Sequence, residues 1–259
     1  MLLPLSYLFR LLIRLRRVAY TAGLLRTYHS RIPIIVVGNI CVGGSGKTPL
    51  VIWLADFLKK KGFSPGIISR GYGGTSRNFP KRVHADSDPA RVGDEAVLMA
   101  QRAGCPVVID PVRSRAARVL EQTCDILIAD DGLQHYALGR TVEIAVIDGA
   151  RPFGNGYCLP AGPLREPPSR LNSVDFIVVN GKLRDDIRLD KLIPLSLRID
   201  EMALVDRGLV NLHDKTFTKS AKDFAEGPVH ALAGIGNPGR FFAQLRSLGL
   251  QLIEHPCPD

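Results

Sequence analysis

Beyond residue 31, short apolar runs alternate with segments whose apolar positions recur at helical spacing. Continuous apolar runs are typical of strands that are buried on both faces of a sheet. Strands that alternate with helices predict a mainly parallel sheet with flanking helices. The predicted strands are residues 34–37, 66–69, 107–109, 126–129, 144–147, 176–179 and 231–233, and the predicted helices are residues 50–58, 96–103, 241–248 and one that begins near residue 113.

The N-terminal segment has a different pattern, in which leucines group on one side of a helix and arginines lie away from them. The residues are Leu8, Leu11, Leu12 and Leu15 on the apolar side and Arg10, Arg14 and Arg17 on the basic side. The opening apolar run ends at Arg10, well short of the roughly 20 residues that cross a bilayer. The pattern fits both a helix lying in the headgroup region of an anionic membrane and a helix packed on the domain.

Length and composition are those of a folded globular protein. The 259 residues are 46% hydrophobic and 23% charged, which excludes long disorder. The five cysteines form no C-x-x-C pair, so neither a disulfide framework nor a zinc site is expected. This cysteine usage predicts a protein of the reducing cytoplasm. The net charge of +9, with no acidic residue before Asp56, predicts an anionic partner or surface. Nucleic acid is not expected, because the chain carries no recognition motif for it.

A glycine-rich loop, GNICVGGSGKTP at residues 38–49, separates the first predicted strand from an amphipathic helix. Strand, glycine-rich loop, Lys-Thr and helix in this order predict a phosphate-binding loop. Lys47 would reach the β- and γ-phosphates of a nucleotide, and Thr48 would ligate Mg²⁺. The match is imperfect because Cys41 occupies the place of the motif's first glycine. The predicted nucleotide-binding residues are Ile40, Cys41, Val42, Gly43, Gly44, Ser45, Gly46, Lys47 and Thr48.

Polar residues follow the predicted strand 126–129, in the sequence DDGLQH at residues 130–135. A Mg²⁺-nucleotide site needs a carboxylate at the end of a neighbouring strand, and Asp130 is the candidate. Asp131-Gly132 also fits a simple turn. Gln134 and His135 would add polar groups at the carboxyl edge of the sheet, where α/β proteins bind their ligands.

Other polar positions allow two interpretations each. Asp94 begins a predicted helix, where an acidic residue is usually a cap but can also serve as a general base. Arg70, in a glycine-rich loop, and Arg113, at a helix start, could bind anionic groups or be solvated. The Gly- and Pro-rich stretch 149–168 is too long for a simple connector and predicts a functional loop. Within it, Arg165 and Glu166 are expected to form a fixed charged pair, or Glu166 to approach a Mg²⁺-phosphate group.

With these motifs in order, the chain resembles the tetraacyldisaccharide 4′-kinase (lipid A 4′-kinase) family nearly from end to end. The matching elements are LLPLS, VVGNICVGGSGKTP, ISRGYGG, VGDE, DDGLQH, LPAGPLREP and AGIGNPGRFF. The resemblance implies an α/β fold of the P-loop NTPase type, with a mainly parallel sheet and a smaller C-terminal α/β unit. It divides the chain into a membrane-associating helix at 1–32, a kinase core at 33–182, and a linker with an incomplete C-terminal domain at 183–259.

The resemblance also implies an activity and a set of roles. The enzyme would lie at the cytoplasmic face of the bacterial inner membrane and transfer the γ-phosphate of ATP, with Mg²⁺, to the 4′-hydroxyl of an acylated glucosamine disaccharide 1-phosphate, giving lipid IVA. No protein partner is evident. Asp94 would be the catalytic base and Lys47 would act on the phosphates. The other implied roles are metal binding for Thr48, Asp130 and Glu166, and substrate binding for Arg70, Arg113, Asp131, Gln134 and His135.

Two departures from the family and two alternatives remain. The family usually begins with a few more residues before the LLPLS element, which matters little. The family continues past Pro258-Asp259 with a Pro-Asp-His-His element whose histidine is thought to support the base. Without that continuation we expect impaired catalysis, and a C-terminal unit with exposed apolar surface and an unpaired sheet edge. The alternatives are a truncated, inactive nucleotide- or lipid-binding remnant and a membrane-associated P-loop switch ATPase, although Val42 stands where those ATPases often carry a lysine.

Overall fold

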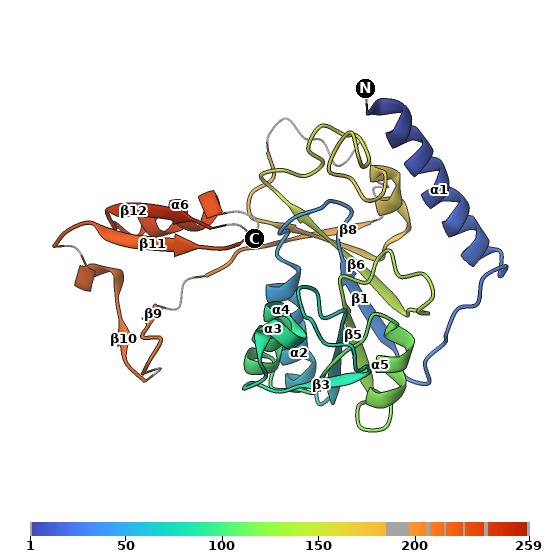
Figure 1. Ribbon diagram of the computed structural model, residues 1–259, viewed down its shortest axis with the longest axis horizontal. Helices are drawn as coiled ribbons and strands as arrows, with labels where there is room; N and C mark the ends of the chain where they lie inside the picture. Colours follow the sequence, from blue (N-terminus) through green and yellow to red (C-terminus); the bar gives the residue numbers. More distant parts are fainter. Residues whose placement is uncertain are drawn as a thin grey trace. The chain divides into compact units, whose positions relative to one another are not determined.

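The structure, a computed structural model, describes residues 2–184, 197–205, 208–214, 216–224, 226–235 and 238–257. The chain forms two compact units, Met1–Met202 and Ala203–Asp259 (Figure 1). The first unit extends past the predicted boundary at residue 182, because the strand β8 (Arg198–Met202) pairs with its sheet.

The described part of the first unit is an α/β domain whose sheet has eight strands in the order β3-β4-β2-β5-β1-β6-β7-β8. Every pairing in it is parallel except that of β3 with β4. Its elements are α1 (Leu3–Thr21), β1 (Ile34–Gly38), α2 (Lys47–Lys60), β2 (Pro65–Ser69), β3 (Lys81–Val83), α3 (Pro89–Val92), α4 (Asp94–Arg102), β4 (Val107–Ile109), α5 (Arg113–Leu120), β5 (Ile126–Asp130), β6 (Val142–Asp148), the 3₁₀ helix η1 (Pro168–Ser173), β7 (Phe176–Asn180) and β8.

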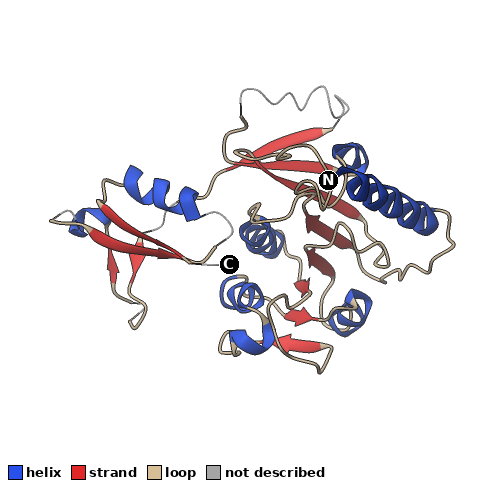
Figure 2. Cartoon of the chain, turned by 45° about the horizontal axis from the view of Figure 1, so that its top comes forward, coloured by secondary structure: helices blue, strands red, loops and turns tan. Residues whose placement is uncertain are grey.

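The predicted mainly parallel sheet with flanking helices is confirmed, and the strands missed by the sequence analysis lie at its edges. β3 is a three-residue strand, and β8 is only partly buried, so neither contains the continuous apolar run that marks a central strand. Alternate residues of the central strands enter different cores. Val36 and Ile68 pack with α5 on one face, while Val37 and Ile67 pack with α2 and α4 on the other. Helices therefore cover both faces of the sheet (Figure 2).

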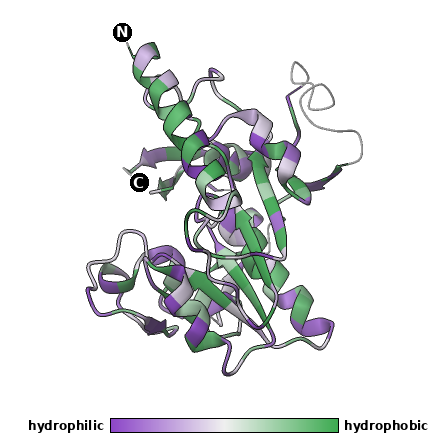
Figure 3. Ribbon diagram, turned by 90° about the vertical axis from the view of Figure 1, so that its right-hand side faces the viewer, coloured by the Kyte–Doolittle hydropathy of each residue, from purple (hydrophilic) through white to green (hydrophobic). Residues whose placement is uncertain are grey.

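Helix α1 packs on the first unit through one face and exposes the opposite face. Ser6 is buried, and Phe9 packs against the core. Seven apolar side chains on the other face are each more than half exposed: Leu5, Tyr7, Leu8, Leu11, Leu12, Leu15 and Val18. Figure 3 shows how apolar residues predominate along this helix. Both patterns expected from the sequence are thus present, a packed helix and an exposed apolar face. None of the described helices is both long and apolar enough to cross a bilayer.

The described residues of the second unit form two small sheets. β9 (Leu209–Val210) pairs antiparallel with β10 (Thr218–Lys219), followed by the 3₁₀ helix η3 (Ala221–Phe224). β11 (Val229–Ala233) and β12 (Leu252–Pro256) form a parallel pair connected by α6 (Pro238–Ser247). Ala231, Ala233 and Phe242 form its small core, whereas Leu232 and Ile253 are exposed. The expected exposed apolar surface is therefore present in this unit.

Candidate active site

The glycine-rich loop begins at the carboxyl end of the central strand β1, beside the carboxyl end of β5. Val37 pairs with Asp130, so the loop and the DDGLQH segment start at the same edge of the sheet. Gly38 lies against Leu133, and a Cβ at Gly38 would come within 2.8 Å of the Leu133 Cγ. Gly46 has φ 91° and lies against Asn180 and Met202, so both backbone geometry and space favour glycine there.

The shape of the loop is held by its own side chains and by a neighbouring strand end. The Asn39 amide donates to the Ser45 hydroxyl at 3.1 Å, and the Asn180 amide donates to the Ser45 carbonyl at 3.0 Å. Ile40 is buried in the core, so only its backbone faces the loop. The Cys41 thiol donates to the Pro152 carbonyl, and burial raises its pKa to about 11, which keeps this thiol protonated.

The long loop 149–168 packs directly on the phosphate loop, and its functional role remains a prediction. The Val42 N–H donates to the Pro163 carbonyl at 2.8 Å, and the Arg165 N–H donates to the Ile40 carbonyl at 2.7 Å. Leu164 bridges Cys41 in the antiparallel sense. These backbone contacts fix the first half of the phosphate loop from outside.

Lys47 and Thr48 each meet a carboxylate across the sheet edge. The Lys47 Nζ lies 3.4 Å from the Asp131 Oδ1, and the Thr48 hydroxyl donates to the Glu95 Oε1 at 3.3 Å. Burial raises the pKa of Glu95 despite opposition from Lys47 and Thr48. Glu95 is a site residue that the sequence analysis did not select. The sequence feature that could have identified Glu95 is its position next to Asp94 in the VGDE motif.

Asp130 is 2% exposed and has an unusual electrostatic environment. Its Oδ2 accepts from the Ser69 hydroxyl at 3.3 Å, while its buried Oδ1 has no hydrogen-bond partner among the described residues. Burial, followed by the charges of Glu95 and Asp131, raises its pKa to about 7 against the effect of Lys47 and Arg113. A buried carboxylate oxygen without a partner fits the oxygen ligands that Mg²⁺ prefers.

The raised pKa of Asp130 predicts how stability depends on pH. Its pKa is about 7 in the folded state and about 3.9 in an unfolded chain. The folded state therefore favours the protonated form, and this contribution is complete below pH 4 and lost as the pH rises through 7. In metal-free buffer at pH 8, Asp130→Asn should raise Tm by about 3 °C or more, equivalent to about 1 kcal/mol. The difference should shrink at pH 5, and equal gains at both pH values would contradict this account.

Asp131 lies between two cations. Its φ of 46° is left-handed, which suits an aspartate that ends a strand in a turn. Arg165 donates to both of its carboxylate oxygens, at 3.0 and 2.8 Å, in addition to the Lys47 ion pair. Although burial opposes ionisation, Lys47 and Arg165 outweigh it and lower the Asp131 pKa. Asp131 is therefore ionised at neutral pH.

The expected pair between Arg165 and Glu166 was wrong. Arg165 binds Asp131, whereas Glu166 lies 3.6 Å from Arg170 and accepts a hydrogen bond from Gln134 at 2.8 Å. The two neighbouring residues reach different partners: Arg165 contacts the residue that follows β5, whereas Glu166 is buried among Arg170, Gln134 and Tyr136. Arg165 is thus, after Glu95, a second residue of the site that the sequence analysis did not select, because it paired Arg165 with Glu166. The role of Glu166 at a metal remains a prediction.

Asp94 is the first residue of α4 and is exposed. Its Oδ1 accepts from the N–H of the next residue, Glu95, at 2.9 Å. The N-cap position of α4 is Gly93, so Asp94 does not make the side-chain hydrogen bond of an N-cap residue. Gly93, with φ 91°, lies against the backbone of Gly71 and Tyr72, which brings the loop that follows β2 beside the start of α4. Asp94 therefore lies next to Glu95, the partner of Thr48, and its role as a base remains a prediction.

The remaining predicted residues are not equally placed. Arg113 is 4% exposed, and its guanidinium donates at 3.2 Å to the carbonyls of Asp130 and Asp131, so it supports the end of β5. Arg70 is exposed after β2. Burial, with Arg113, Arg140, Arg16 and Arg70, lowers the pKa of His135 to about 4, so this imidazole is neutral at pH 7. Substrate binding by these residues remains a prediction.

Comparisons with known proteins agree in one assignment. The sequence model of the Tetraacyldisaccharide-1-P 4′-kinase family matches residues 1–259. A tetraacyldisaccharide 4′-kinase from Nitrosococcus oceani is 50% identical over 262 residues, covering 100% of this chain and 73% of its own length. One from Coxiella burnetii is 48% identical over 258 residues, covering 99% of this chain and 72% of its own.

A solved structure supports the same assignment. LpxK from Aquifex aeolicus, crystallised in complex with ATP, superposes with a TM-score of 0.77 at 29% identity. The match covers 100% of this chain and 81% of that one. By sequence over its whole length and by fold, the chain belongs to the tetraacyldisaccharide-1-P 4′-kinase family.

Proposed function

We propose that this chain transfers the γ-phosphate of ATP to the 4′-hydroxyl of tetraacyldisaccharide 1-phosphate, giving lipid IVA. The observation that carries the proposal is the meeting of Lys47 and Thr48 with Asp131 and Glu95 at one edge of the sheet. Phosphoryl transfer asks a protein mainly for positioning and for neutralisation of charge, and this edge contains groups suited to both. The relative that was crystallised with ATP supports the choice of nucleotide.

The phosphate loop and the residues around it have separate roles in binding the nucleotide. Backbone N–H groups of the glycine-rich turn and the start of α2 bind phosphate oxygens, and Lys47 neutralises charge between the β- and γ-phosphates. Thr48 and Asp130, with Glu95 next to them, would hold Mg²⁺, which when bound supplies further charge neutralisation at the phosphates. Asp131, already ionised, keeps Lys47 and Arg165 at the strand end.

Asp94 is the proposed general base. Its position beside Glu95, and its exposure, allow a hydroxyl of an incoming substrate to reach its carboxylate. Accepting that proton as the oxygen attacks the γ-phosphate is worth typically 10²- to 10⁴-fold in rate. Arg70, exposed on the neighbouring loop, is the proposed contact for an anionic group of the substrate.

The membrane partner follows from the exposed face of α1. An acylated substrate resides in a bilayer, and the exposed leucines of α1 lie between the exposed arginines Arg10 and Arg14 on one edge and Arg16 on the other. An apolar face bordered by cations is typical of helices that lie in the headgroup region of anionic membranes. We place the enzyme at the cytoplasmic face of the bacterial inner membrane, where ATP is available.

The membrane role predicts a loss of vesicle binding when the apolar face becomes polar. Leu11→Gln with Leu15→Gln should weaken binding to phosphatidylglycerol vesicles by about 10- to 100-fold, since two leucines no longer bury their side chains in lipid. The control is Leu98→Gln with Val112→Gln, two exposed apolar side chains elsewhere on the first unit. Vesicle sedimentation measures both. Equal binding by the two double variants would refute the role of α1.

The activity is tested by transfer of labelled γ-phosphate from ATP to tetraacyldisaccharide 1-phosphate in detergent micelles. A labelled bisphosphorylated lipid is the expected product. ATP hydrolysis at full rate without any labelled lipid would contradict the proposal and favour a switch ATPase.

A further inference from the structure

We propose that residues 158–173, the brace, couple the position of α1 to the geometry of the phosphate loop. This inference builds on the proposed nucleotide site and gives that site a means of sensing the membrane-facing helix. It rests on an unbroken series of contacts, all within the first unit, that begins on α1 and ends on the backbone of Asn39.

The first contacts join α1 to both ends of the brace. The Ser6 hydroxyl donates to the Cys158 carbonyl at 2.7 Å, and Ser6 is the residue of α1 that is buried. Near the other end of the helix, the Arg17 Nη2 donates to the Ser173 hydroxyl at 2.7 Å. Together with the packing of Phe9 on the core, these two hydrogen bonds hold the helix against the brace.

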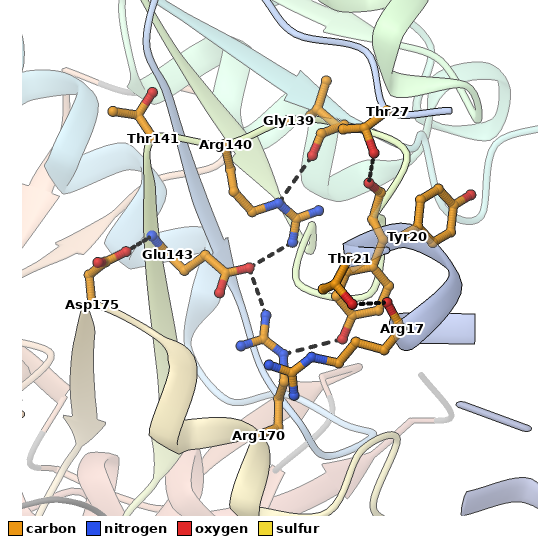
Figure 4. Close-up of a pocket in the computed structure, with 12 residues that line it drawn as sticks. Arg17, Tyr20, Thr21, Thr27, Gly139, Arg140, Thr141, Glu143, Arg170 and Asp175 are labelled. Carbon is orange, nitrogen blue, oxygen red and sulfur yellow. Dashed lines mark hydrogen bonds and ion pairs between the residues drawn. The ribbon is translucent and has the colours of Figure 1, made fainter. Parts of the chain in front are cut away.

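Inside the brace, the contact continues through buried charges. The Ser173 hydroxyl also accepts from the Arg170 Nη1 at 2.7 Å, so one oxygen joins Arg17 to Arg170. Arg170 is 2% exposed and Glu166 is 1% exposed, and the two form an ion pair. Figure 4 shows Arg17 and Arg170 at a pocket of about 340 Å³, with Glu143 bonded to Arg170.

The last contacts join Glu166 to the phosphate loop. Its two carboxylate oxygens accept hydrogen bonds from the Gln134 amide, at 2.8 Å, and from the Tyr136 hydroxyl. The same Gln134 nitrogen donates to the Asn39 carbonyl at 2.9 Å, directly after β1. The backbone bonds of residues 163–165 to Ile40 and Val42 run beside this path.

The physical reason for coupling is that a satisfied buried polar network has few alternative arrangements. The bond from Arg17 to Ser173 is exposed, but Arg170 and Glu166 are buried, so a shift of either one leaves a buried donor or acceptor without a partner. Glu166 and Arg170 thereby act as positioning residues. The Glu166 carboxylate reaches the phosphate loop through Gln134, and the Glu166 N–H donates directly to the Ile40 carbonyl at 3.4 Å. Coupling between two sites is reciprocal, so binding at the phosphate loop also restrains α1.

The test measures ATP affinity in the absence of lipid. Arg17→Ala and Ser173→Ala should each raise the Kd for ATP by about threefold to tenfold, the usual range for coupling through a contact network. Arg26→Ala is the control, because it removes the same charge from an exposed position just after the same helix, and its Kd should stay within about twofold. Ser173→Thr, which keeps the hydroxyl, should restore the wild-type Kd.

Amide hydrogen exchange gives a second measurement that a merely structural role would not change. ATP should slow exchange in residues 3–21 of the wild type and leave it unchanged in Ser173→Ala. If Arg17→Ala binds ATP as Arg26→Ala does, and ATP does not affect exchange in α1, the coupling is overturned while the nucleotide site stands. A wild-type chain that fails to bind ATP would instead overturn the proposed function.

Discussion

Lys47→Ala is expected to lower kcat/KM for lipid phosphorylation by about 10³-fold, the scale of losing one cation from a phosphoryl-transfer site. Lys47 begins α2 and carries a side chain that is only 12% exposed, with its ammonium 3.4 Å from Asp131. Its charge would be applied to phosphate oxygens in the ground state as well as in the transition state. Both ATP affinity and kcat should therefore fall.

The loss has a second cause in the surrounding carboxylates. Lys47 lowers the pKa of each of its three acidic neighbours, Glu95, Asp130 and Asp131. Without the ammonium, their mutual repulsion is less compensated, and all three pKa values should rise. Burial already raises the pKa of Asp130 to about 7, so without Lys47 this carboxyl would be protonated at neutral pH and would be a poorer oxygen ligand for Mg²⁺.

The control for this variant is Lys60→Ala, at the other end of the same helix. Lys60 is 74% exposed and pairs with Asp56, so its removal deletes the same charge from α2 without touching the sheet edge. Both variants should fold, because alanine is the best helix former. Labelled phosphate transfer measures the outcome, and a Lys47→Ala variant as active as Lys60→Ala would exclude Lys47 from the chemistry.

Asp94→Asn is expected to lower kcat by about 10²- to 10⁴-fold while leaving the Kd for ATP within about twofold. Asparagine keeps an oxygen that can accept the Glu95 N–H, so the helix start is preserved and only basicity and charge are removed. A loss confined to kcat is the signature of a group that acts in the chemical step. Single-turnover kinetics with saturating ATP and lipid separate this step from product release.

Asp88→Asn is the matched control. Asp88 caps α3, where its Oδ1 accepts from the Ala90 N–H at 3.0 Å, and it is an exposed aspartate just six residues from Asp94. If Asp94 were only a cap, the two variants would behave alike, with small changes in stability and none in kcat. Full activity of Asp94→Asn would move the search for a base to Glu95, the nearest other carboxylate.

The central part of the fold was predictable because its signals are local. β4 was predicted at its observed bounds, and the predicted β5 differs from the observed Ile126–Asp130 by one residue. Strands buried on both faces consist of continuous apolar residues, which the sequence shows directly. β3 and β8 were missed because a strand at the edge of a sheet needs no such run. The boundary of the first unit moved to Met202 for the same reason.

The phosphate loop, the helix after it and the carboxylates at the end of β5 were determined by the sequence alone. Each is encoded by contiguous residues whose conformation and chemistry depend on their near neighbours. The exposed apolar face of α1 was also determined in this way, since helical spacing decides which side chains share a face.

Only the tertiary structure decided which charged groups meet. Glu95 lies 47 positions from Thr48, and Arg165 lies 34 positions from Asp131, yet both pairs are in contact. Arg165 and Glu166 are adjacent in sequence but bind different partners. Arg113 is buried and donates a hydrogen bond to the carbonyl of Asp130 at the end of β5. The partner of a long charged side chain depends on packing and desolvation at the sheet edge. The distances between such side chains are set only when the strands align in the folded sheet.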